Sequence, residues 1–329
     1  MEPFTELDDD QRTRINSIRQ EIQAIYDAGT PVFTKDNIRK VGEELERFRK
    51  GECNDGAKIT LMGINGVSYE IFVNPPIPIA DRGENEHVGG ATWKISYNSI
   101  TSLTNLQHMQ LYWESQQAYL PMRIYSPIMR VGQGVKFQTP PTPPEQDFDR
   151  FQAIEQQWKT SQHFEQVQEL LASVKIPFTL TLTKVIGLGL GPIVFNSRVF
   201  ERFVFQHALV SVLRQKFSVS LNPIVQDPAY SQRDRDILSS AGVTVLEDPQ
   251  ALLELDESSI LLTISPGLPV KDIVADTCRP GIIIWNGGAP HITHSPRVKR
   301  MIEDEYHQVP FPEHESFRNL VMLIRKSTT

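Results

Sequence analysis

The residues best suited to bind a ligand form the segment Gly187-Leu188-Gly189-Leu190-Gly191, which ends an apolar run that begins at Thr183. Glycine has no side chain, so the main chain can turn sharply there and approach a phosphate, a ribose or a carboxylate closely. In a Rossmann-type sheet such a turn joins the first strand to the first helix. The pattern predicts ligand contacts at all three glycines, although a tight turn that serves only the fold fits it equally well.

Polar residues stand where later apolar runs end, and these are the other candidates for chemistry. Asp227 ends the second run, where many Rossmann-type sheets place a carboxylate against ribose hydroxyls, although its spacing from Gly187 exceeds the usual roughly 20 residues. Loops at the carboxyl ends of parallel strands line the ligand crevice of such sheets. The predicted catalytic residues are Asp227 and Tyr230, and the further predicted ligand contacts are Ser231, Ser265, Asn286 and Gly287. Ser231 also fits the N-cap of a helix.

The elements that must position these residues alternate between strand and helix. Strands are predicted to end at the glycine segment and to cover residues 223–227, 243–246, 259–264, 281–286 and 320–324, with helices over 198–217, 232–240, 270–277 and 295–305. The strand runs are almost continuously apolar, which is typical of strands covered by helices on both faces. The predicted fold class is α/β, a Rossmann-like doubly wound, mostly parallel sheet, over residues 175–329.

Four motifs within this region resemble those of a known family. They are the glycine segment, Gln206-His207-Ala208-Leu209, Gln226-Asp227-Pro228-Ala229-Tyr230-Ser231 and Ser240-Ala241-Gly242-Val243-Thr244-Val245-Leu246. Together they resemble the sensitivity-to-red-light-reduced-like domain, in an extended form of fungal type. The resemblance implies a Rossmann-like protein that binds a small ligand in a regulatory or metabolic role, of the haem or circadian type, and it supplies no catalytic residue. The stretch from Ser265 to Pro269 departs from the His- or Cys-containing stretch that plant and animal members usually have there.

A second resemblance points to an enzyme. Some fungal proteins similar to divergent members of this family are arginine-containing cyclodipeptide synthases, which would make aminoacyl-tRNA the partner. Their acidic DDxxE motif has no counterpart here: after Asp8-Asp9-Asp10, Arg12 and Thr13 stand where the glutamate would fall. The nearest C-terminal stretch, Glu303-Asp304-Glu305-Tyr306-His307, has Glu303 and His307 at the outer positions. The synthase is therefore the alternative function. A methyltransferase that uses S-adenosylmethionine is the third, because it would tolerate the GxGxG pattern.

The composition and several missing motifs argue against other classes of site. A net charge of −7 lacks the basic excess expected for extended nucleic-acid binding. No Lys-Ser or Lys-Thr follows Gly191, which argues against a P-loop, and Pro192 breaks the GxGxxG fingerprint of NAD sites. His291 and His294 are three residues apart, but metal or haem ligation needs further ligands that the sequence does not show. The cofactor stays unassigned and no metal is predicted.

The cysteine content and hydropathy suggest where the protein resides. Cys53 and Cys278 are too few and too far apart for a disulfide framework, which favours a reducing compartment. No apolar run approaches the roughly 20 residues that span a bilayer, and the acidic N-terminus does not resemble a signal peptide. The expectation is the cytosol or the nucleus, without a membrane partner.

The remainder of the chain predicts a separate N-terminal part. Residues 1–140 are predicted to form an α+β module, with a first helix that starts at Asp8 to Asp10, a second capped by Thr34, and a hairpin whose strands, 59–64 and 67–73, flank a type I′ turn at Asn65-Gly66. A third helix is predicted over 103–118. Residues 141–174 are expected to be a linker and a lead-in helix, followed by the Rossmann-like domain at 175–329.

Overall fold

The computed structural model of the chain describes residues 7–53, 57–73, 93–125, 144–194, 201–287, 294–317 and 319–327. The chain divides into two compact units, Met1–Val131 and Gly132–Thr329. The predicted proline-rich linker and the residues from Gly288 to Thr293 lie outside the described residues. Across the described part of the chain, every helix is too short or too polar to traverse a lipid bilayer.

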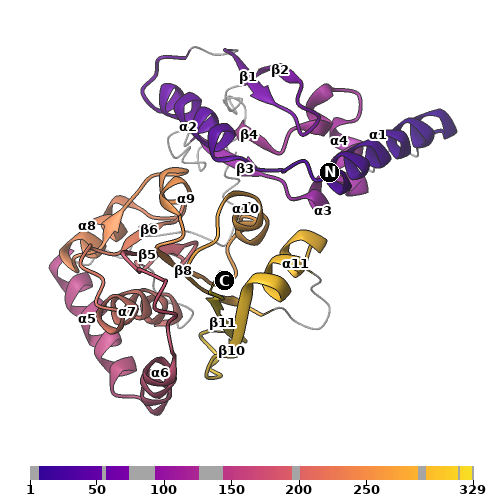
Figure 1. Ribbon diagram of the computed structural model, residues 1–329. Coiled ribbons are helices and arrows are strands. Elements are labelled where there is room, and N and C mark those ends of the chain that lie inside the picture. The colour runs from indigo at the N-terminus through magenta and orange to yellow at the C-terminus, as the bar shows by residue number, and fades with distance from the viewer. Residues whose placement is uncertain are drawn as a thin grey trace. The chain divides into compact units, whose positions relative to one another are not determined.

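The first unit combines short helices with two small antiparallel sheets, β1 with β2 and β3 with β4 (Figure 1). Its elements are α1 (Asp9–Asp27), α2 (Lys35–Arg49), β1 (Lys58–Met62), β2 (Ser68–Phe72), β3 (Lys94–Tyr97), α3 (Ile100–Leu103), α4 (Leu106–Tyr112), the 3-10 helix η1 (Gln116–Tyr119) and β4 (Met122–Tyr125). The first two helices begin where the sequence predicts, because the side chains of Asp8 and Thr34 accept hydrogen bonds from main-chain N–H groups in the first turn of each helix.

Two predictions about this unit are wrong in detail. The hairpin does not close with a two-residue type I′ turn: only Gly66 has a positive φ, and its N–H donates to the Gly63 carbonyl. That geometry makes a three-residue connection that ends in a left-handed glycine. The single helix predicted over 103–118 is three short ones, because the Asn105 side chain caps a new helix by accepting from Gln107 N.

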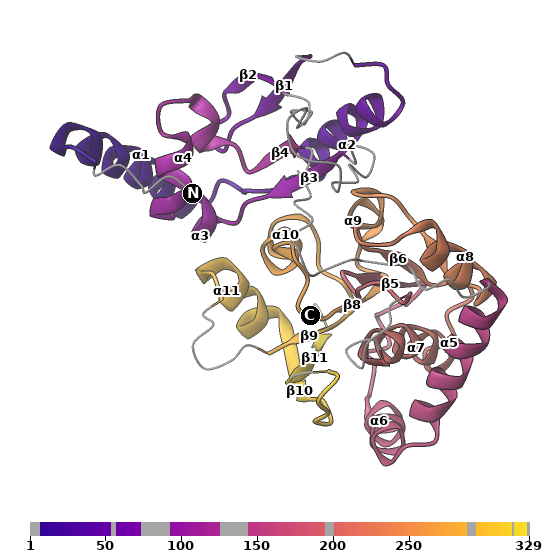
Figure 2. The same cartoon turned by 180° about the vertical axis from the view of Figure 1, so that it is seen from behind.

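The second unit contains the larger sheet. Its elements are α5 (Pro144–Lys159), α6 (Gln162–Ser173), β5 (Lys184–Leu188), α7 (Glu201–Lys216), β6 (Ile224–Gln226), α8 (Gln232–Ser240), β7 (Thr244–Val245), α9 (Gln250–Glu254), β8 (Ser259–Thr263), α10 (Val270–Thr277), β9 (Ile282–Asn286), α11 (Pro296–Glu305), β10 (Tyr306–Pro310) and β11 (Leu320–Arg325). Figure 2 shows β10 and β11 together at the C-terminal end of this unit.

The strands lie side by side in the order β10-β11-β9-β8-β5-β6-β7. The five from β9 to β7 are parallel, and β11 runs antiparallel to both β9 and β10. In chain order the parallel strands follow the 3-2-1-4-5 arrangement of a Rossmann sheet. The predicted α/β, Rossmann-like fold is therefore confirmed. The order reverses direction between β5 and β8, which is where such sheets have their switch point.

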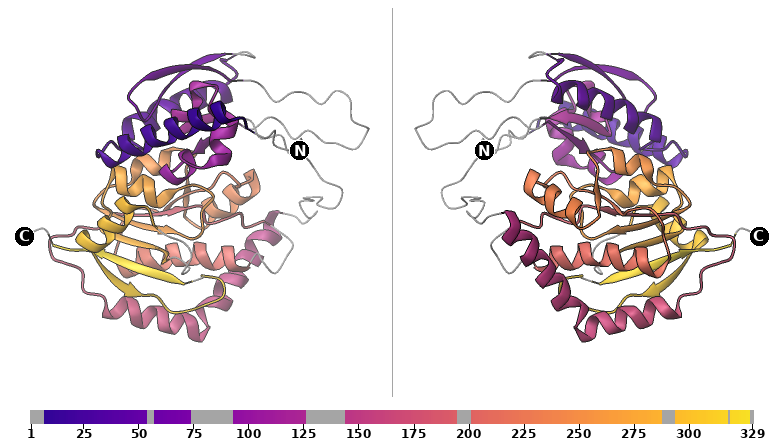
Figure 3. Two further views of the ribbon diagram at one scale, coloured as in Figure 1. Left: turned by 90° about the vertical axis from the view of Figure 1, so that its right-hand side faces the viewer. Right: turned by 90° about the vertical axis from the view of Figure 1, so that its left-hand side faces the viewer.

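Helices cover both faces of this sheet (Figure 3). Residues of α5, α6, α7 and α8 share one core with the strands, and α10 and α11 lie on the opposite face. Trp158 of α5 is buried. The centre of its ring lies 6.1 Å from the ring centre of Phe205 on α7 and 5.6 Å from that of Phe317. All five residues of β8 are buried, as the continuous apolar run predicts. Helices α5 and α6 are thus part of the core of the second unit.

One strand, β10, was not predicted from the sequence. β10 begins at Tyr306, directly after α11 ends at Glu305, and pairs with β11 at the margin of the sheet. Its residues, Tyr-His-Gln-Val-Pro, carry no apolar run, and proline is tolerated only in edge strands because it lacks an N–H donor. The pairing of β10 therefore depends on the neighbouring β11 more than on its own sequence.

Candidate functional site

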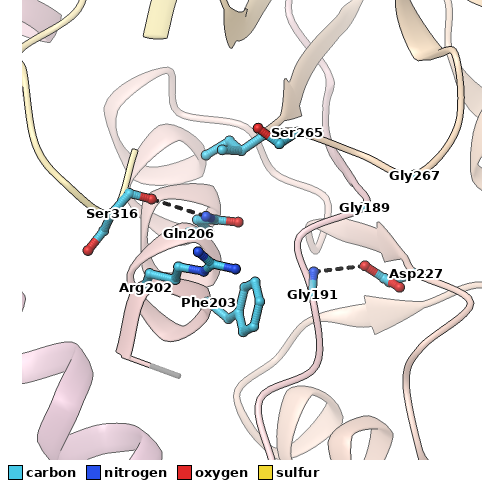
Figure 4. A pocket seen from close by; sticks show the side chains of 10 residues that line it. Gly189, Gly191, Arg202, Phe203, Gln206, Asp227, Ser265, Gly267 and Ser316 are labelled. Carbon is cyan, nitrogen blue, oxygen red and sulfur yellow. Dashed lines mark hydrogen bonds between the residues drawn. The ribbon is translucent and has the colours of Figure 1, made fainter. Parts of the chain in front are cut away.

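A cavity of about 270 Å³ opens at the carboxyl ends of β5 and β8, at the switch point of the sheet. Its walls come from the turn after β5, the loop after β8, the first turns of α7, the end of β6 and the segment before β11 (Figure 4). The lining residues are Gly189, Gly191, Arg202, Phe203, Gln206, Asp227, Ile264, Ser265, Gly267 and Ser316.

The three predicted glycines have different positions and different reasons to be glycine. Gly189 and Gly191 line the cavity with φ angles of +65° and +80°, which side chains rarely adopt. A Cβ on Gly189 would lie 2.7 Å from the Cβ of Pro266, so the turn packs directly against the loop after β8. Gly187 lies within β5, where a Cβ would meet the Leu190 side chain at 2.6 Å. Gly187 therefore serves packing, and the other two form part of the cavity wall.

Asp227 lines the cavity and also holds the glycine turn. One oxygen of its carboxylate accepts from Gly191 N at 2.7 Å, and the other accepts from Ala229 N at 2.8 Å. A carboxylate hydrogen-bonded to main-chain donors is fixed in place and still offers lone pairs to other groups. The predicted catalytic residue is thus present at the cavity, with a structural contact that the sequence did not indicate.

Asp234, which the sequence analysis missed, anchors the same loop from beneath. It is 1% exposed. Its Oδ1 accepts from Ile193 N at 2.6 Å and from Val194 N at 2.8 Å, while Oδ2 accepts from the N–H and the hydroxyl of Ser231. Ser231 in turn caps α8 and forms a capping box with Asp234. The hydroxyl of this predicted ligand contact is therefore already engaged within the protein. The Ser-x-x-Asp spacing was the available signal for this arrangement.

Tyr230 lies in the core beside the cavity. Its hydroxyl is 2.7 Å from His207 Nε2, and His207 Nδ1 is 2.6 Å from the Phe203 carbonyl oxygen. Because a carbonyl only accepts, Nδ1 carries the proton and Nε2 accepts from the Tyr230 hydroxyl. Burial lowers the pKa of His207 to about 4 and raises the pKa of Tyr230 well above its ordinary value. The pair is neutral at pH 7, and the Tyr230 hydroxyl is directed at His207.

The remaining predicted contacts form a support around Ser265. Ser265 lines the cavity with a φ of +51°, a left-handed conformation that costs free energy for a residue with a side chain. Asn286 Oδ1 holds it there by accepting from Ser265 N at 2.5 Å and from its hydroxyl at 3.1 Å. Gly287 N donates to the Asn319 carbonyl at 2.9 Å. Asn286 and Gly287 thus lie behind the cavity wall, and Ser265 is part of it.

Six lining residues were not among the predicted site residues: Arg202, Phe203 and Gln206 from α7, Ile264 and Gly267 near Ser265, and Ser316 from the segment before β11. The sequence of α7 carries a signal for Gln206 alone. This glutamine interrupts a mostly apolar run from Val204 to Leu213, nine residues of which are buried, and a polar side chain in such a run needs a partner. Nothing in the sequence places Ser316 near Gln206, because 110 positions separate them.

The cavity does not fit haem, the cofactor type suggested by the family resemblance. Haem iron takes His, Cys, Met or Tyr as axial ligands. None of the described residues that line the cavity is of these types. His291 lies outside the described residues, and no three His, Cys, Asp or Glu side chains of the described ranges converge on a point where a metal ion could bind.

The acidic clusters weighed for a synthase lie elsewhere in their units. Asp8 caps α1, and Glu305 pairs with Arg279 at 2.8 Å at the end of α11. Neither stretch supplies a residue to the cavity. Asp227 is therefore the carboxylate that the structure offers to a ligand there.

Comparison with known proteins identifies a family to which the chain is similar. The model of the SRR1 domain, named for sensitivity to red light reduced, matches residues 154–322, from α5 to β11 and just over half of the chain. No curated protein matches. Among solved structures, the crystal structure of Thermoplasma acidophilum 1320 is similar over 54% of this chain and 98% of its own, at 13% identity and a TM-score of 0.30.

Removing the Asp234 carboxylate should destabilise the second unit. Asp234→Ala leaves buried N–H groups of Ile193 and Val194 without an acceptor, and charge-assisted bonds of this kind contribute about 1.5–3 kcal/mol each. We expect the free energy of unfolding to fall by at least about 3 kcal/mol in urea denaturation. Asp236→Ala on the same helix is the control, because its side chain is exposed and accepts from Gln232, itself exposed on that helix. Equal losses in the two variants would contradict the anchoring role.

Two glycines that line the cavity, Gly189 and Gly267, should respond differently to alanine. Gly189→Ala should lower the free energy of unfolding by at least about 2 kcal/mol, since it adds left-handed strain to a contact with Pro266. Gly267→Ala should change it by less than about 0.5 kcal/mol, because nothing lies within 4 Å of its Cβ position. Thermal or urea unfolding checks both, and a Gly189 variant as stable as the wild type would show that the turn tolerates a side chain.

The buried His207 predicts a loss of stability in mild acid. Its pKa is about 4 in the folded protein and near 6.5 in the unfolded chain, so the unfolded state binds an extra proton as the pH falls below about 6.5. Each such proton lowers the free energy of unfolding by about 1.4 kcal/mol per pH unit. Urea denaturation between pH 7 and pH 5 should show this slope. In His207→Gln the slope of the free energy of unfolding against pH should be smaller by about 1.4 kcal/mol per pH unit. An unchanged slope in that variant would rule out His207 as its source.

Proposed function

This chain belongs to the SRR1 domain family, and from that premise we propose that its second unit binds a small polar molecule in the cavity between β5 and β8, in a regulatory or metabolic role. The observation that carries the proposal is the position of the cavity. It lies at the switch point of a Rossmann-ordered sheet, where open α/β sheets bind their ligands.

The wall chemistry supports a ligand of modest size. Ligand pockets usually measure about 300–1,000 Å³, and a cavity of about 270 Å³ suits a molecule such as an amino acid or a nucleoside better than an extended dinucleotide. Bare main chain at Gly189 and Gly267 lets a ligand approach the turn after β5 and the loop after β8 closely. The carboxylate of Asp227 offers an acceptor for hydroxyl or ammonium groups.

The same carboxylate favours one second candidate, an enzyme that handles an aminoacyl group. Asp227 could orient the amine of such a substrate within the cavity. Incubation with transfer RNA, aminoacyl-tRNA synthetases and labelled arginine tests this candidate. A cyclic dipeptide that disappears in Asp227→Asn would establish it, whereas no product together with saturable ligand binding would leave a binding protein.

Filling the cavity should abolish ligand binding without unfolding the protein. Gly267 lines the cavity and nothing lies within 4 Å of its Cβ position, so Gly267→Trp adds a bulky side chain to the cavity wall at little cost to the fold. Titration calorimetry of the full chain with AMP, adenosine, S-adenosylmethionine and L-arginine should find at least one saturable ligand. Its affinity should fall by at least about tenfold in Gly267→Trp, or about 1.4 kcal/mol.

The matched control is Gln215→Trp, which adds the same side chain at an exposed position of α7. It should bind the ligand as the wild type does. Equal affinity in the two tryptophan variants would place the binding site elsewhere, and the absence of saturable binding by every compound would remove the proposal.

A further inference from the structure

We propose that Arg202 and Gln206 form a subsite for a ligand group in which anionic oxygens adjoin an N–H or O–H donor. This inference rests on the proposed function, because both side chains line the same cavity. Carboxylate and phosphate share the chemistry that a guanidinium recognises. The experiment below separates these two sources.

Gln206 supplies an acceptor that the protein itself leaves unused. Its side chain is 3% exposed, and its Nε2 donates to the Ser316 carbonyl at 3.2 Å. Because a carbonyl only accepts, the amide nitrogen must face Ser316, which fixes Oε1 on the other side. Figure 4 shows Oε1 directed away from Ser316, toward the side where Gly189 lies.

The oxygen of this amide finds no hydrogen-bond partner among the described residues. Leaving a buried acceptor unsatisfied costs about 1–3 kcal/mol, so native structures rarely keep one without a reason. A ligand donor that reached Gln206 would remove this cost. The unsatisfied oxygen therefore indicates a group that the bound state supplies.

Arg202 supplies a cation one helical turn before Gln206, on the same face of α7. No ion pair joins it to a carboxylate of the described ranges, and its buried Nε has no hydrogen-bond partner there. The guanidinium lies 4.7 Å from the centre of the Phe203 ring, which orients it without neutralising it. A guanidinium stays charged and presents donors in a planar fork that matches two anionic oxygens.

Arg202 and Asp227 place opposite charges on the wall of the cavity. In Figure 4, Arg202 and Gln206 lie on one side of Gly191 and Asp227 lies on the other. A ligand with its anionic group toward Arg202 would place hydroxyl or ammonium donors toward Asp227. A nucleoside monophosphate meets this requirement through phosphate and ribose, and an α-amino acid meets it through carboxylate and ammonium.

The test compares probes that differ only in the anionic group. AMP is compared with adenosine for phosphate, and L-arginine with agmatine for carboxylate, each titrated into the full chain by calorimetry. We expect at least one anionic probe to bind at least about tenfold more tightly than its partner. This preference should disappear in Arg202→Gln and persist in Lys216→Gln, which removes a positive charge from an exposed position of the same helix.

Gln206→Met separates ligand recognition from a structural role. Methionine keeps the length of the side chain and removes both the unsatisfied oxygen and the donor to the Ser316 carbonyl. These two changes have opposite effects on stability, so the melting temperature of the free protein should change little. Affinity for the anionic probe should fall by about threefold or more. A lower melting temperature with unchanged affinity would show that Gln206 serves only the fold and would overturn its place in the subsite.

The remaining outcomes distinguish this inference from the function on which it rests. If adenosine and agmatine each bind as tightly as their anionic partners, and Gly267→Trp still blocks them, the cavity binds a ligand but the anionic subsite is wrong. The subsite is also wrong if Arg202→Gln binds the anionic probe as the wild type does. Failure of both anionic probes to bind overturns the subsite as well.

Discussion

Two carboxylates determine the shape of the loop after β5, and the rest of the site depends on them. Asp227, just after β6, accepts from Gly191, and Asp234, in the first turn of α8, accepts from Ile193 and Val194. Three main-chain donors of one loop are thus bound by two carboxylates. These donors belong to no helix or strand, and an unpaired buried N–H is costly. The bonds therefore fix where the chain leaves the sheet on its way to α7.

A fixed turn and a strained residue in the loop that contacts it together form part of the cavity wall. Gly189 packs against Pro266, and Ser265 keeps its left-handed conformation because Asn286 accepts from it twice. The residues at the strand ends thus shape the main chain for the most part. The side chains that give the cavity its charge and polarity come largely from α7, and Asp227 belongs to both groups.

The fold was predictable from the sequence because local patterns carry it. Apolar runs without alternation indicated the buried strands, and the βα repeats indicated a parallel sheet, as β5, β6, β8 and β9 show. Short elements were less predictable. The helix expected over 103–118 is interrupted where Asn105 caps a new turn, and β10 owes its conformation to pairing with β11.

The candidate site was predictable only where it follows strand ends. Gly189, Gly191, Asp227 and Ser265 line the cavity, and each stands just after an apolar run. Arg202 and Gln206 come from a helix buried on most sides, where a linear pattern does not say which residues meet an opening. Tyr230 follows a strand but turns inward to His207, a contact between positions 23 apart that only the packed structure defines.

The two outermost strands of the large sheet affect how the protein behaves in a crowded solution. β7 has two residues, and β10 ends in Pro310, which offers no N–H to a neighbour. Short edge strands and prolines on the sheet edge discourage strand pairing between molecules and aggregation. The apolar parallel strands in the middle are thereby kept from recruiting strands of other chains.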